Sequence, residues 1–260
     1  MAQNIYDDPV FFNGYSQLPR QILGLAGAPE WPAIRALLPA LIDKHVVDLG
    51  CGFGWAARWM RQQGAATVLG IDLSSRMIAR ARAETTDPAI EYRVADLETL
   101  DLPENMFGLA YSALAFHYIK DFHRLAKAIH RSLRPGGDLV FTIEHPIFMS
   151  ASHPHWIHDE EGRKIWPVDH YADEGERRTD WFIHGVVKYH RTFATTINIL
   201  IETGFELCRI VEFAPTQVQI EGAPELAEER ERPMMLSISA RKPNVMISDC
   251  VHKPSADKPG

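Results

Sequence analysis

The chain has 260 residues, of which 46% are hydrophobic and 23% are charged. These proportions are ordinary for a globular protein with one substantial core. The formal net charge of -7 argues against a nucleic-acid partner, because such partners are bound through phosphate neutralisation. Three scattered cysteines exclude a disulfide framework and a structural zinc site. No signal segment or long apolar run is visible, so we expect a cytoplasmic protein that does not span a membrane.

Short apolar runs alternate with helical patterns through the first half of the chain. Five strands are predicted, over residues 46–49, 67–71, 90–94, 107–112 and 138–143. Ser74 or Ser75 and Asp121 are the predicted caps of intervening helices, and residues 134–137 are a predicted turn. A helix over 192–203 and strands over 205–213 and 234–240 follow. This order predicts an α/β fold, with a seven-stranded, mostly parallel sheet and helices on both faces.

Residues 146–190 form a long insertion after the fifth strand, without a long periodic segment. The insertion is crowded with His, Trp, Asp, Glu and Pro. Connections of this length are typical of lids and binding segments, so we predict a cap here. We assign residues 1–242 to a single domain that includes the cap. The polar, proline-containing residues 243–260 are predicted to be a disordered tail.

The stretch VVDLGCGFG, residues 46–54, is a strand that runs into a glycine-rich turn and then a helix. Glycines let the backbone approach a ligand closely, and the helix N-terminus offers unpaired N–H groups. The spacing G-x-G-x-G differs from the dinucleotide fingerprint G-x-G-x-x-G. Asp48 would repel a pyrophosphate but suits an ammonium group. The turn therefore favours S-adenosylmethionine, which has an ammonium group and no phosphate, over a nicotinamide dinucleotide.

Two further acids follow the next two strands. Asp72 could accept hydrogen bonds from both hydroxyls of a ribose, and Asp96 could bind an adenine amino group. The carboxyl ends of parallel strands meet at the crevice where open α/β sheets bind ligands. One such Asp is usually a helix cap or a turn residue. Three acids in register, counting Asp48, predict one binding site.

Residues 44–145 resemble the class I S-adenosylmethionine-dependent methyltransferases, through VVDLGCGFG, GIDLS, ADLETLDLP, FGLAYSALAFHYIKD and LRPGGDLVF. The similarity is to the branch that includes the ubiquinone and menaquinone C-methyltransferases. The resemblance implies a Rossmann-like fold with S-adenosylmethionine as cofactor. It also implies these contacts to the cofactor: Asp48, Gly50, Cys51, Gly52 and Ala113 with the methionine part, Asp72 with the ribose, and Leu73, Asp96 and Leu97 with the adenine.

The acceptor is expected to be a small molecule. Residues 112–116 read SALAF, not the acid-Pro-Pro-aromatic signature of enzymes that methylate amines of nucleic-acid bases. No cysteine lies where methylation of cytosine C5 would need a nucleophile. We therefore predict methyl transfer to O, N or C of a small acceptor. The alternatives are a non-catalytic S-adenosylmethionine-binding sensor or scaffold and, less favoured by the glycine spacing, a nicotinamide oxidoreductase.

Three histidines are candidate general bases at the expected mouth of the site: His117, His145 and His190. Histidine titrates near neutral pH, but each of these is equally well explained as a structural or solvated residue. Aligning the acceptor with the methyl carbon can itself contribute roughly 7–11 kcal/mol, so a base is not obligatory. Glu144 either binds an acceptor amine or caps a turn.

The cap contains two further groups of candidates. His153, His155 and His158 could hold a metal ion, but a histidine-rich loop is the simpler explanation, and we predict no metal site. Three tryptophans either line an aromatic pocket or, as we favour, attach the cap to the domain; these are Trp156, Trp166 and Trp181. Tyr15 and its neighbouring aromatics are expected to cover the cofactor from the other side.

Overall fold

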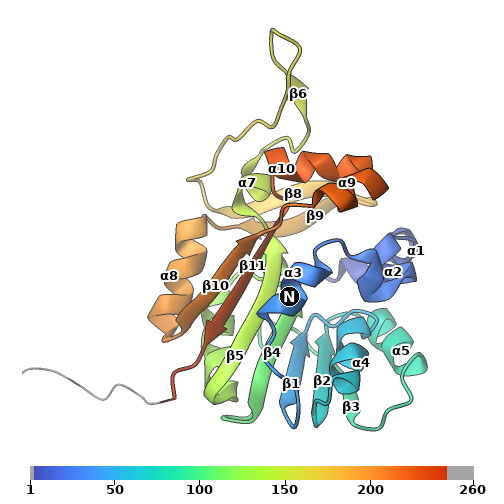
Figure 1. Cartoon of the computed structure of the whole chain (residues 1–260), viewed down its shortest axis with the longest axis vertical. Helices are drawn as coiled ribbons and strands as arrows, with labels where there is room; N and C mark the ends of the chain where they lie inside the picture. Colours follow the sequence, from blue (N-terminus) through green and yellow to red (C-terminus); the bar gives the residue numbers. More distant parts are fainter. Residues whose placement is uncertain (1–2, 245–260) are drawn as a thin grey trace, which may run out of the picture.

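The computed structural model describes residues 3–244. Its centre is a seven-stranded sheet with the order β10-β11-β5-β4-β1-β2-β3 (Figure 1). The strands from β1 to β5 pair in parallel, whereas β11 and β10 are antiparallel to their neighbours. The predicted Rossmann-like, mostly parallel sheet is confirmed. The strands are β1 (His45–Leu49), β2 (Thr67–Asp72), β3 (Ile90–Val94), β4 (Phe107–Ala113), β5 (Leu133–Glu144), β10 (Glu206–Glu212) and β11 (Met235–Arg241).

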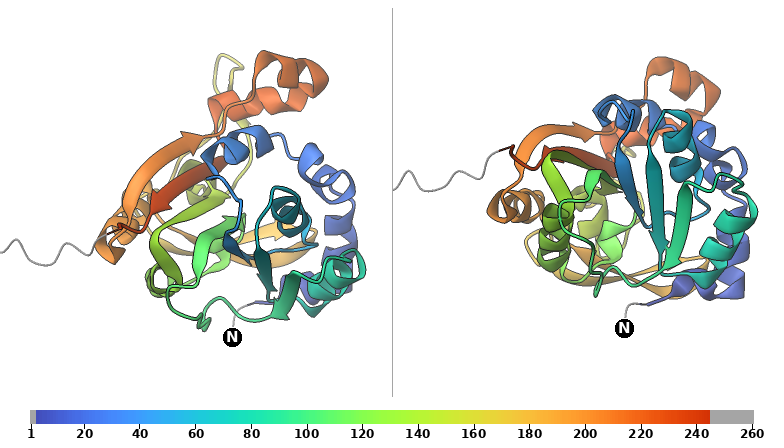
Figure 2. Two further views of the ribbon diagram at one scale, coloured as in Figure 1. Left: turned by 60° about the horizontal axis from the view of Figure 1, so that its bottom comes forward. Right: turned by 90° about the horizontal axis from the view of Figure 1, so that it is seen from below.

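Helices cover both faces of this sheet (Figure 2). One face packs against α3 (Trp31–Leu37), α4 (Trp55–Gln62) and α5 (Ser75–Ala83), and the other against α6 (Phe122–Ser132) and α8 (Phe193–Thr203). Successive strand residues point to opposite faces. Val46 therefore packs in the apolar cluster on the side of α3, α4 and α5, and Val47 in the cluster on the side of α6 and α8. Such two-sided burial requires the almost uninterrupted apolar runs seen in the sequence.

The predicted helix caps are present. The side chain of Ser74 accepts a hydrogen bond from the backbone N–H of Met77, and that of Asp121 from Arg124. The predicted turn at residues 134–137 is instead the irregular beginning of β5. Gly136 keeps a turn-like φ of 74°, but its N–H donates to the carbonyl of Lys242. Pairing with the end of β11 therefore draws this turn into the sheet.

The cap is more regular than the sequence indicated. It contains α7 (Pro146–Ser150), a short β6–β7 arm (Ile157–His158 and Lys164–Ile165) and a hairpin of β8 (Gly175–Trp181) and β9 (Ile183–His190). The expectation of no long periodic segment was wrong. Along β8, partly buried residues such as Arg177 and Thr179 alternate with exposed residues such as Glu176 and Arg178. Because polar side chains occupy both faces, this alternation in burial is not visible as an alternation of polar and apolar residues in the sequence.

The N-terminal segment, residues 3–37, connects the cap to the sheet. It comprises η1 (Ile5–Asp7), α1 (Pro9–Ser16), α2 (Pro19–Ile22), η2 (Gly24–Gly27) and α3. Gln3 donates to the carbonyl of Gly185 and accepts from the N–H of Val187, both in β9. Asp7 accepts from the hydroxyl of Ser74 at 2.6 Å and from the N–H of Arg76 at 3.1 Å, at the start of α5. The beginning of the segment is therefore hydrogen-bonded both to the cap hairpin and to α5.

The chain after α8 completes the sheet. Between β10 and β11 it forms α9 (Gln217–Gly222), η4 (Pro224–Ala227) and α10 (Glu228–Glu231). No helix within residues 3–244 is long and apolar enough to cross a membrane. Most of the predicted tail lies outside the described residues, and the assignment of residues 1–242 to one domain stays a prediction.

A buried ion pair joins the cap hairpin to the central sheet. Lys188 of β9 contacts Glu144, the last residue of β5, with 2.5 Å between Nζ and Oε1 and with side chains only 6% and 13% exposed. Removing one partner of such a pair leaves the other charge desolvated and uncompensated. The pair therefore makes the position of the hairpin dependent on both residues.

We predict that Lys188→Met lowers the free energy of unfolding by about 3 kcal/mol, because Glu144 loses its counter-charge. The double variant Glu144→Leu, Lys188→Met should recover most of this loss. Lys164→Met is the matched control, because Lys164 pairs with Glu228 at a more exposed position, where such pairs contribute about 1 kcal/mol or less. Urea unfolding measures all three, and equal losses in the two single variants would contradict the prediction.

Candidate functional site

A cavity of ≈ 240 Å³ lies at the carboxyl ends of the parallel strands. This volume far exceeds the roughly 10–15 Å³ that one water molecule requires, so it is space for a ligand. A second cavity of ≈ 100 Å³ adjoins it and shares Gly50, Gly52 and Ala113 with it. All nine residues predicted to contact the cofactor line one or both of these cavities: Asp48, Gly50, Cys51, Gly52, Asp72, Leu73, Asp96, Leu97 and Ala113.

The glycine turn after β1 lines both cavities through Gly50 and Gly52. Gly50 and Gly54 have φ values of +78° and +76°, and a Cβ on either would lie 2.4 Å from Ala115 Cβ or 2.1 Å from the Tyr92 hydroxyl. Gly52 also has a positive φ, but no atom lies within 4 Å of where its Cβ would be. Two glycines are therefore required by packing, and the third leaves its backbone open to a ligand.

Asp72 holds the turn in place from the end of β2. Its Oδ2 accepts from the N–H of Gly52 and its Oδ1 from that of Ser74, both at 2.9 Å. Burial raises the pKa of Asp72, and these hydrogen bonds oppose the rise. Each carboxylate oxygen retains a second acceptor site. The side chain can thus order two loops and still face the larger cavity with acceptor capacity.

The smaller cavity is lined by buried polar atoms that have no partner within the described residues. They are Asp48 Oδ2, Glu30 Oε2 and Trp55 Nε1. Arg20, also in the lining, contacts Glu30 at 2.9 Å. Acceptors and donors together complement an ammonium group beside a carboxylate. Arg20, Glu30 and Trp55 were not predicted from the sequence. Arg20 in α2 and Glu30 in the turn before α3 lie far from the glycine turn along the chain.

Four tyrosines line the larger cavity, and one of them, Tyr189, belongs to β9. Tyr6 and Tyr15 come from the N-terminal segment, as expected of its aromatics, and Tyr118 comes from η3 (Phe116–Tyr118). The hydroxyls of Tyr6 and Tyr118 are 3.3 Å apart, and the ring of Tyr6 is nearly perpendicular to those of Tyr15 and Tyr118. Leu114, which lines both cavities, has a φ of 56°. Such strain in a residue without glycine's freedom is common at ligand sites.

The three histidines predicted as general bases line neither cavity. His117 accepts from the N–H of Glu144, and burial lowers its pKa to about 4. His145 accepts from the N–H of Ile147, and its other ring nitrogen contacts Glu212. The structure therefore does not bring these two rings to the ligand site, because their nitrogens are engaged at the end of β5.

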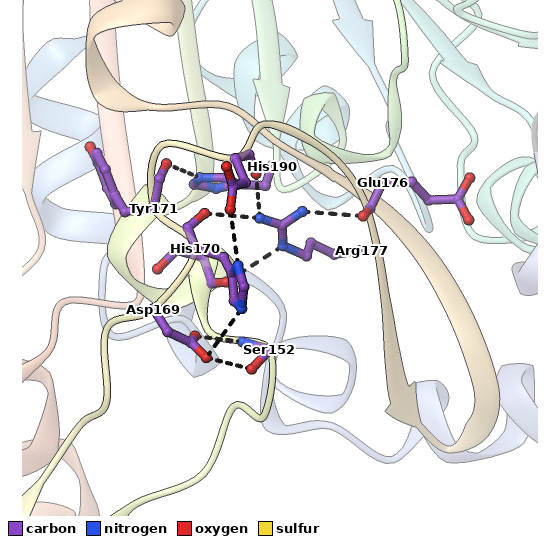
Figure 3. A network of polar contacts seen from close by, with 9 residues as sticks. Ser152, Asp169, His170, Tyr171, Glu176, Arg177 and His190 are labelled. Carbon is purple, nitrogen blue, oxygen red and sulfur yellow. Dashed lines mark hydrogen bonds and ion pairs between the residues drawn. The ribbon is translucent and has the colours of Figure 1, made fainter.

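His190 lies within the cap, in the polar network of Figure 3. Its Nε2 donates to the carbonyl of Tyr171 at 2.8 Å, and burial lowers its pKa. In the same network the guanidinium of Arg177 donates to the carbonyls of His170 and Asp173. The contacts of His190 thus order the segment before β8 and do not reach the cavity.

Other cap residues also have structural contacts. Trp181 packs against Phe11 and Tyr15. Trp156 and Trp166 flank the guanidinium of Arg232. These contacts agree with the favoured role of the tryptophans in attaching the cap. Glu144 caps no turn but binds Lys188. Within residues 3–244 no three His, Cys, Asp or Glu side chains are grouped as metal ligands, so His153, His155 and His158 give the metal alternative no support.

Comparisons with known proteins agree with this geometry. Residues 47–141 match the family model described as a methyltransferase domain. The structure is similar to that of an S-adenosylmethionine-dependent methyltransferase from Mesorhizobium loti, with 55% identity, a TM-score of 0.81 and coverage of 84% of this chain and 100% of that one. A putative S-adenosylmethionine-dependent methyltransferase from Listeria monocytogenes is 39% identical, with a TM-score of 0.76 and coverage of 83% and 98%.

A third similarity is more local. The malonyl-[acyl-carrier protein] O-methyltransferase of Enterobacter lignolyticus is 38% identical over 110 residues, which are 42% of this chain and 43% of that protein. The two structural similarities span nearly the whole of each relative. The chain therefore belongs to the S-adenosylmethionine-dependent methyltransferases, and S-adenosylmethionine is its cofactor.

We predict that binding of the cofactor product, S-adenosylhomocysteine, releases a proton from Asp48. Burial, with the charge of Asp72, raises the pKa of Asp48 to about 8, so the group is mostly neutral at pH 7. A bound ammonium favours the carboxylate, so the pKa falls and about one proton leaves. For the same reason affinity should weaken as the pH falls from 8 to 6.

Calorimetric titration at pH 7 in buffers of different ionisation enthalpy measures this proton. The variant Asp48→Asn should bind more weakly and release none. A binding heat that does not depend on the buffer would show that Asp48 keeps its protonation state.

Proposed function

We propose that the enzyme transfers the methyl group of S-adenosylmethionine to O, N or C of a small-molecule acceptor in the larger cavity. One observation carries this proposal. The cavity that is lined by Asp72, Leu73 and Asp96 also has walls from the N-terminal segment and from the β8–β9 hairpin. A single cavity therefore serves both the cofactor and a second, small ligand.

The described residues fit the cofactor in sequence along the sheet edge. Asp96 and Leu97 would hold the adenine, Asp72 the ribose, and the open backbone at Gly52 the region nearest the sulfur. The unpartnered atoms of the smaller cavity would hold the amino-acid end, Asp48 and Glu30 facing the ammonium and Trp55 the carboxylate. Arg20 would share its charge between Glu30 and that carboxylate.

When bound, the cofactor supplies an electrophilic methyl group on a sulfonium. The residues of this chain align the acceptor with that methyl group and exclude water. Alignment can contribute roughly 7–11 kcal/mol, so the absence of histidine among the described lining residues is no obstacle. The N-terminal segment and the hairpin close the cavity through Gln3, which joins them.

The identity of the acceptor and the branch within the family go beyond the family assignment and are part of this proposal. The resemblance to ubiquinone and menaquinone C-methyltransferases stays a prediction. Local relatives carry the names malonyl-[acyl-carrier protein] O-methyltransferase and trans-aconitate 2-methyltransferase, which support a small acceptor or acceptor group. A sensor or scaffold would need no second ligand beside the cofactor, so the cap-side wall of the cavity favours catalysis.

The proposal is tested by incubating the enzyme with S-adenosylmethionine labelled in its methyl group and panels of phenols, amines, carboxylates and quinol precursors. Transfer of label to at least one small molecule supports it. If S-adenosylhomocysteine binds but label moves only to protein or nucleic acid, the small-molecule assignment is wrong.

For Asp72→Ala we predict a weakening of S-adenosylhomocysteine binding by about 2–3 kcal/mol, or ~30–150-fold. Two hydrogen bonds to an ionised group would be lost, at roughly 1.5–3 kcal/mol each, partly offset by water. Asp101→Ala is the control, because Asp101 is 88% exposed and lines neither cavity. Calorimetry compares the dissociation constants. An unchanged value for Asp72→Ala would show that this residue only shapes the turn.

A further inference from the structure

We propose that the acceptor is a small amine, which the larger cavity takes up as an ammonium ion between its tyrosines and Glu176. This inference rests on the proposed function, since it names the substrate class of the same site. It is carried by three features of the lining: its charge, the one acid left free for the acceptor, and the tyrosines around it.

The lining of the larger cavity is acidic. Its four acids are Asp72, Asp96, Glu98 and Glu176, and among the described residues no Lys, Arg or His is part of it. An anionic acceptor would lose its hydration and face like charges, with no cationic side chain in the described lining to compensate them. An ammonium ion would meet charges of opposite sign. The charge of the cavity thus separates amines from carboxylates. The names of local relatives include both classes, since a phosphoethanolamine N-methyltransferase of Arabidopsis thaliana is 35% identical over 154 residues.

Of the four acids, Glu176 is the one available to the acceptor. Asp72 and Asp96 lie where the cofactor is proposed to bind. The carboxylate of Glu98 accepts from the backbone N–H groups of Lys120 and Asp121 and so fixes the start of α6. Glu176 belongs to β8, opposite Tyr189 of β9, on the cap side of the cavity.

Glu176 forms one ion pair within residues 3–244. Arg178 contacts it with 2.6 Å between Nη2 and Oε1, and this side chain is 64% exposed and does not line the cavity. Exposed pairs of this kind are weak. Glu176 can therefore keep its contact with Arg178 through one oxygen and offer the other to an ammonium group.

Four tyrosines also line the acceptor side: Tyr6, Tyr15, Tyr118 and Tyr189. Burial raises the pKa of Tyr6 and Tyr118, and that of Tyr15 to about 12. These three hydroxyls therefore stay protonated and are not bases. Neutral aromatic rings attract cations through their faces. The same rings that exclude water from the cavity thus stabilise an ammonium ion within it.

The chemistry balances without another reactant. The ammonium first gives a proton to the carboxylate of Glu176, or to water at the open side of the cavity. The nitrogen lone pair then forms the N–C bond as the C–S bond breaks, and the electron pair of that bond passes to sulfur. The products are a methylated ammonium ion and a neutral thioether.

The experiment compares amines with carboxylates and alcohols of similar shape. One set is benzylamine, benzoate and benzyl alcohol, and another is cyclohexylamine, cyclohexanecarboxylate and cyclohexanol. Each is tested as an acceptor of labelled methyl and as a ligand that raises the melting temperature of the S-adenosylhomocysteine complex. We expect methylation of at least one amine and of no carboxylate. The concentration of amine that stabilises the complex should be at least about tenfold lower than the concentration that its matched carboxylate needs.

Variants then test Glu176 itself. Glu176→Gln should raise KM for the amine at least tenfold and leave S-adenosylhomocysteine affinity within about twofold. Glu176→Lys should reverse the preference between amine and carboxylate. Arg178→Gln is the matched control, since it removes a charge outside the cavity and should preserve or strengthen amine binding.

Three outcomes would overturn the inference. They are equal or tighter binding of carboxylates, methylation of a carboxylate in preference to its amine, and failure of every amine to bind while S-adenosylhomocysteine affinity is intact. Failure of S-adenosylhomocysteine itself to bind would instead refute the proposed function, so the two can be told apart.

Discussion

The close approach of the turn after β1 to its neighbours is the constraint on which the site depends. Gly50 and Gly54 have no room for a Cβ, because Ala115 and Tyr92 occupy that space. The N–H groups of Gly50 and Cys51 donate to the carbonyl of Ile71, the penultimate residue of β2. Turn, β2 and the loop after β4 are consequently fixed relative to one another. A larger residue at position 50 would separate the loops that line both cavities.

The two cavities are closed by parts of the chain that the family match at residues 47–141 does not include. Residues 3–37 contact α5 through Asp7 and β9 through Gln3. The buried pair of Lys188 and Glu144 attaches the same hairpin to the end of β5. The acids Asp48, Asp72 and Asp96 of the cofactor side therefore lie within the matched region, whereas most of the acceptor side is built by segments outside it. Substrate choice is accordingly expected to depend on the latter.

Much of the cofactor side could be predicted from the sequence, because its acids lie at the ends of strands that the sequence itself indicates. The acids Asp48, Asp72 and Asp96 each end a strand, and parallel strands bring such ends to one edge. The acceptor side could not be predicted in this way. Glu176 and Tyr189 reach the larger cavity through a hairpin whose alternation was concealed by charged residues on both faces. On the cofactor side, Glu30 was missed for a similar reason, because it reaches the smaller cavity from the turn before α3.

The histidines show the complementary limit. His117 and His145 follow strands that end at the site, so their positions in the chain suggested a role there. Their rings turn away because the backbone N–H groups of Glu144 and Ile147 need acceptors. The order of residues indicates which loop a side chain occupies, but competition for hydrogen bonds within that loop decides where the side chain points.

The central claim is that both cavities form one cofactor site with an acceptor space beside it. The most direct test is a crystal structure of the S-adenosylhomocysteine complex. The account predicts adenine beside Asp96 and Leu97, ribose hydroxyls on Asp72, and the amino-acid end in the smaller cavity between Asp48 and Trp55, leaving the space next to Glu176 free. Density for the ligand in any other place, or an adenine that fills the space beside Glu176, would contradict it.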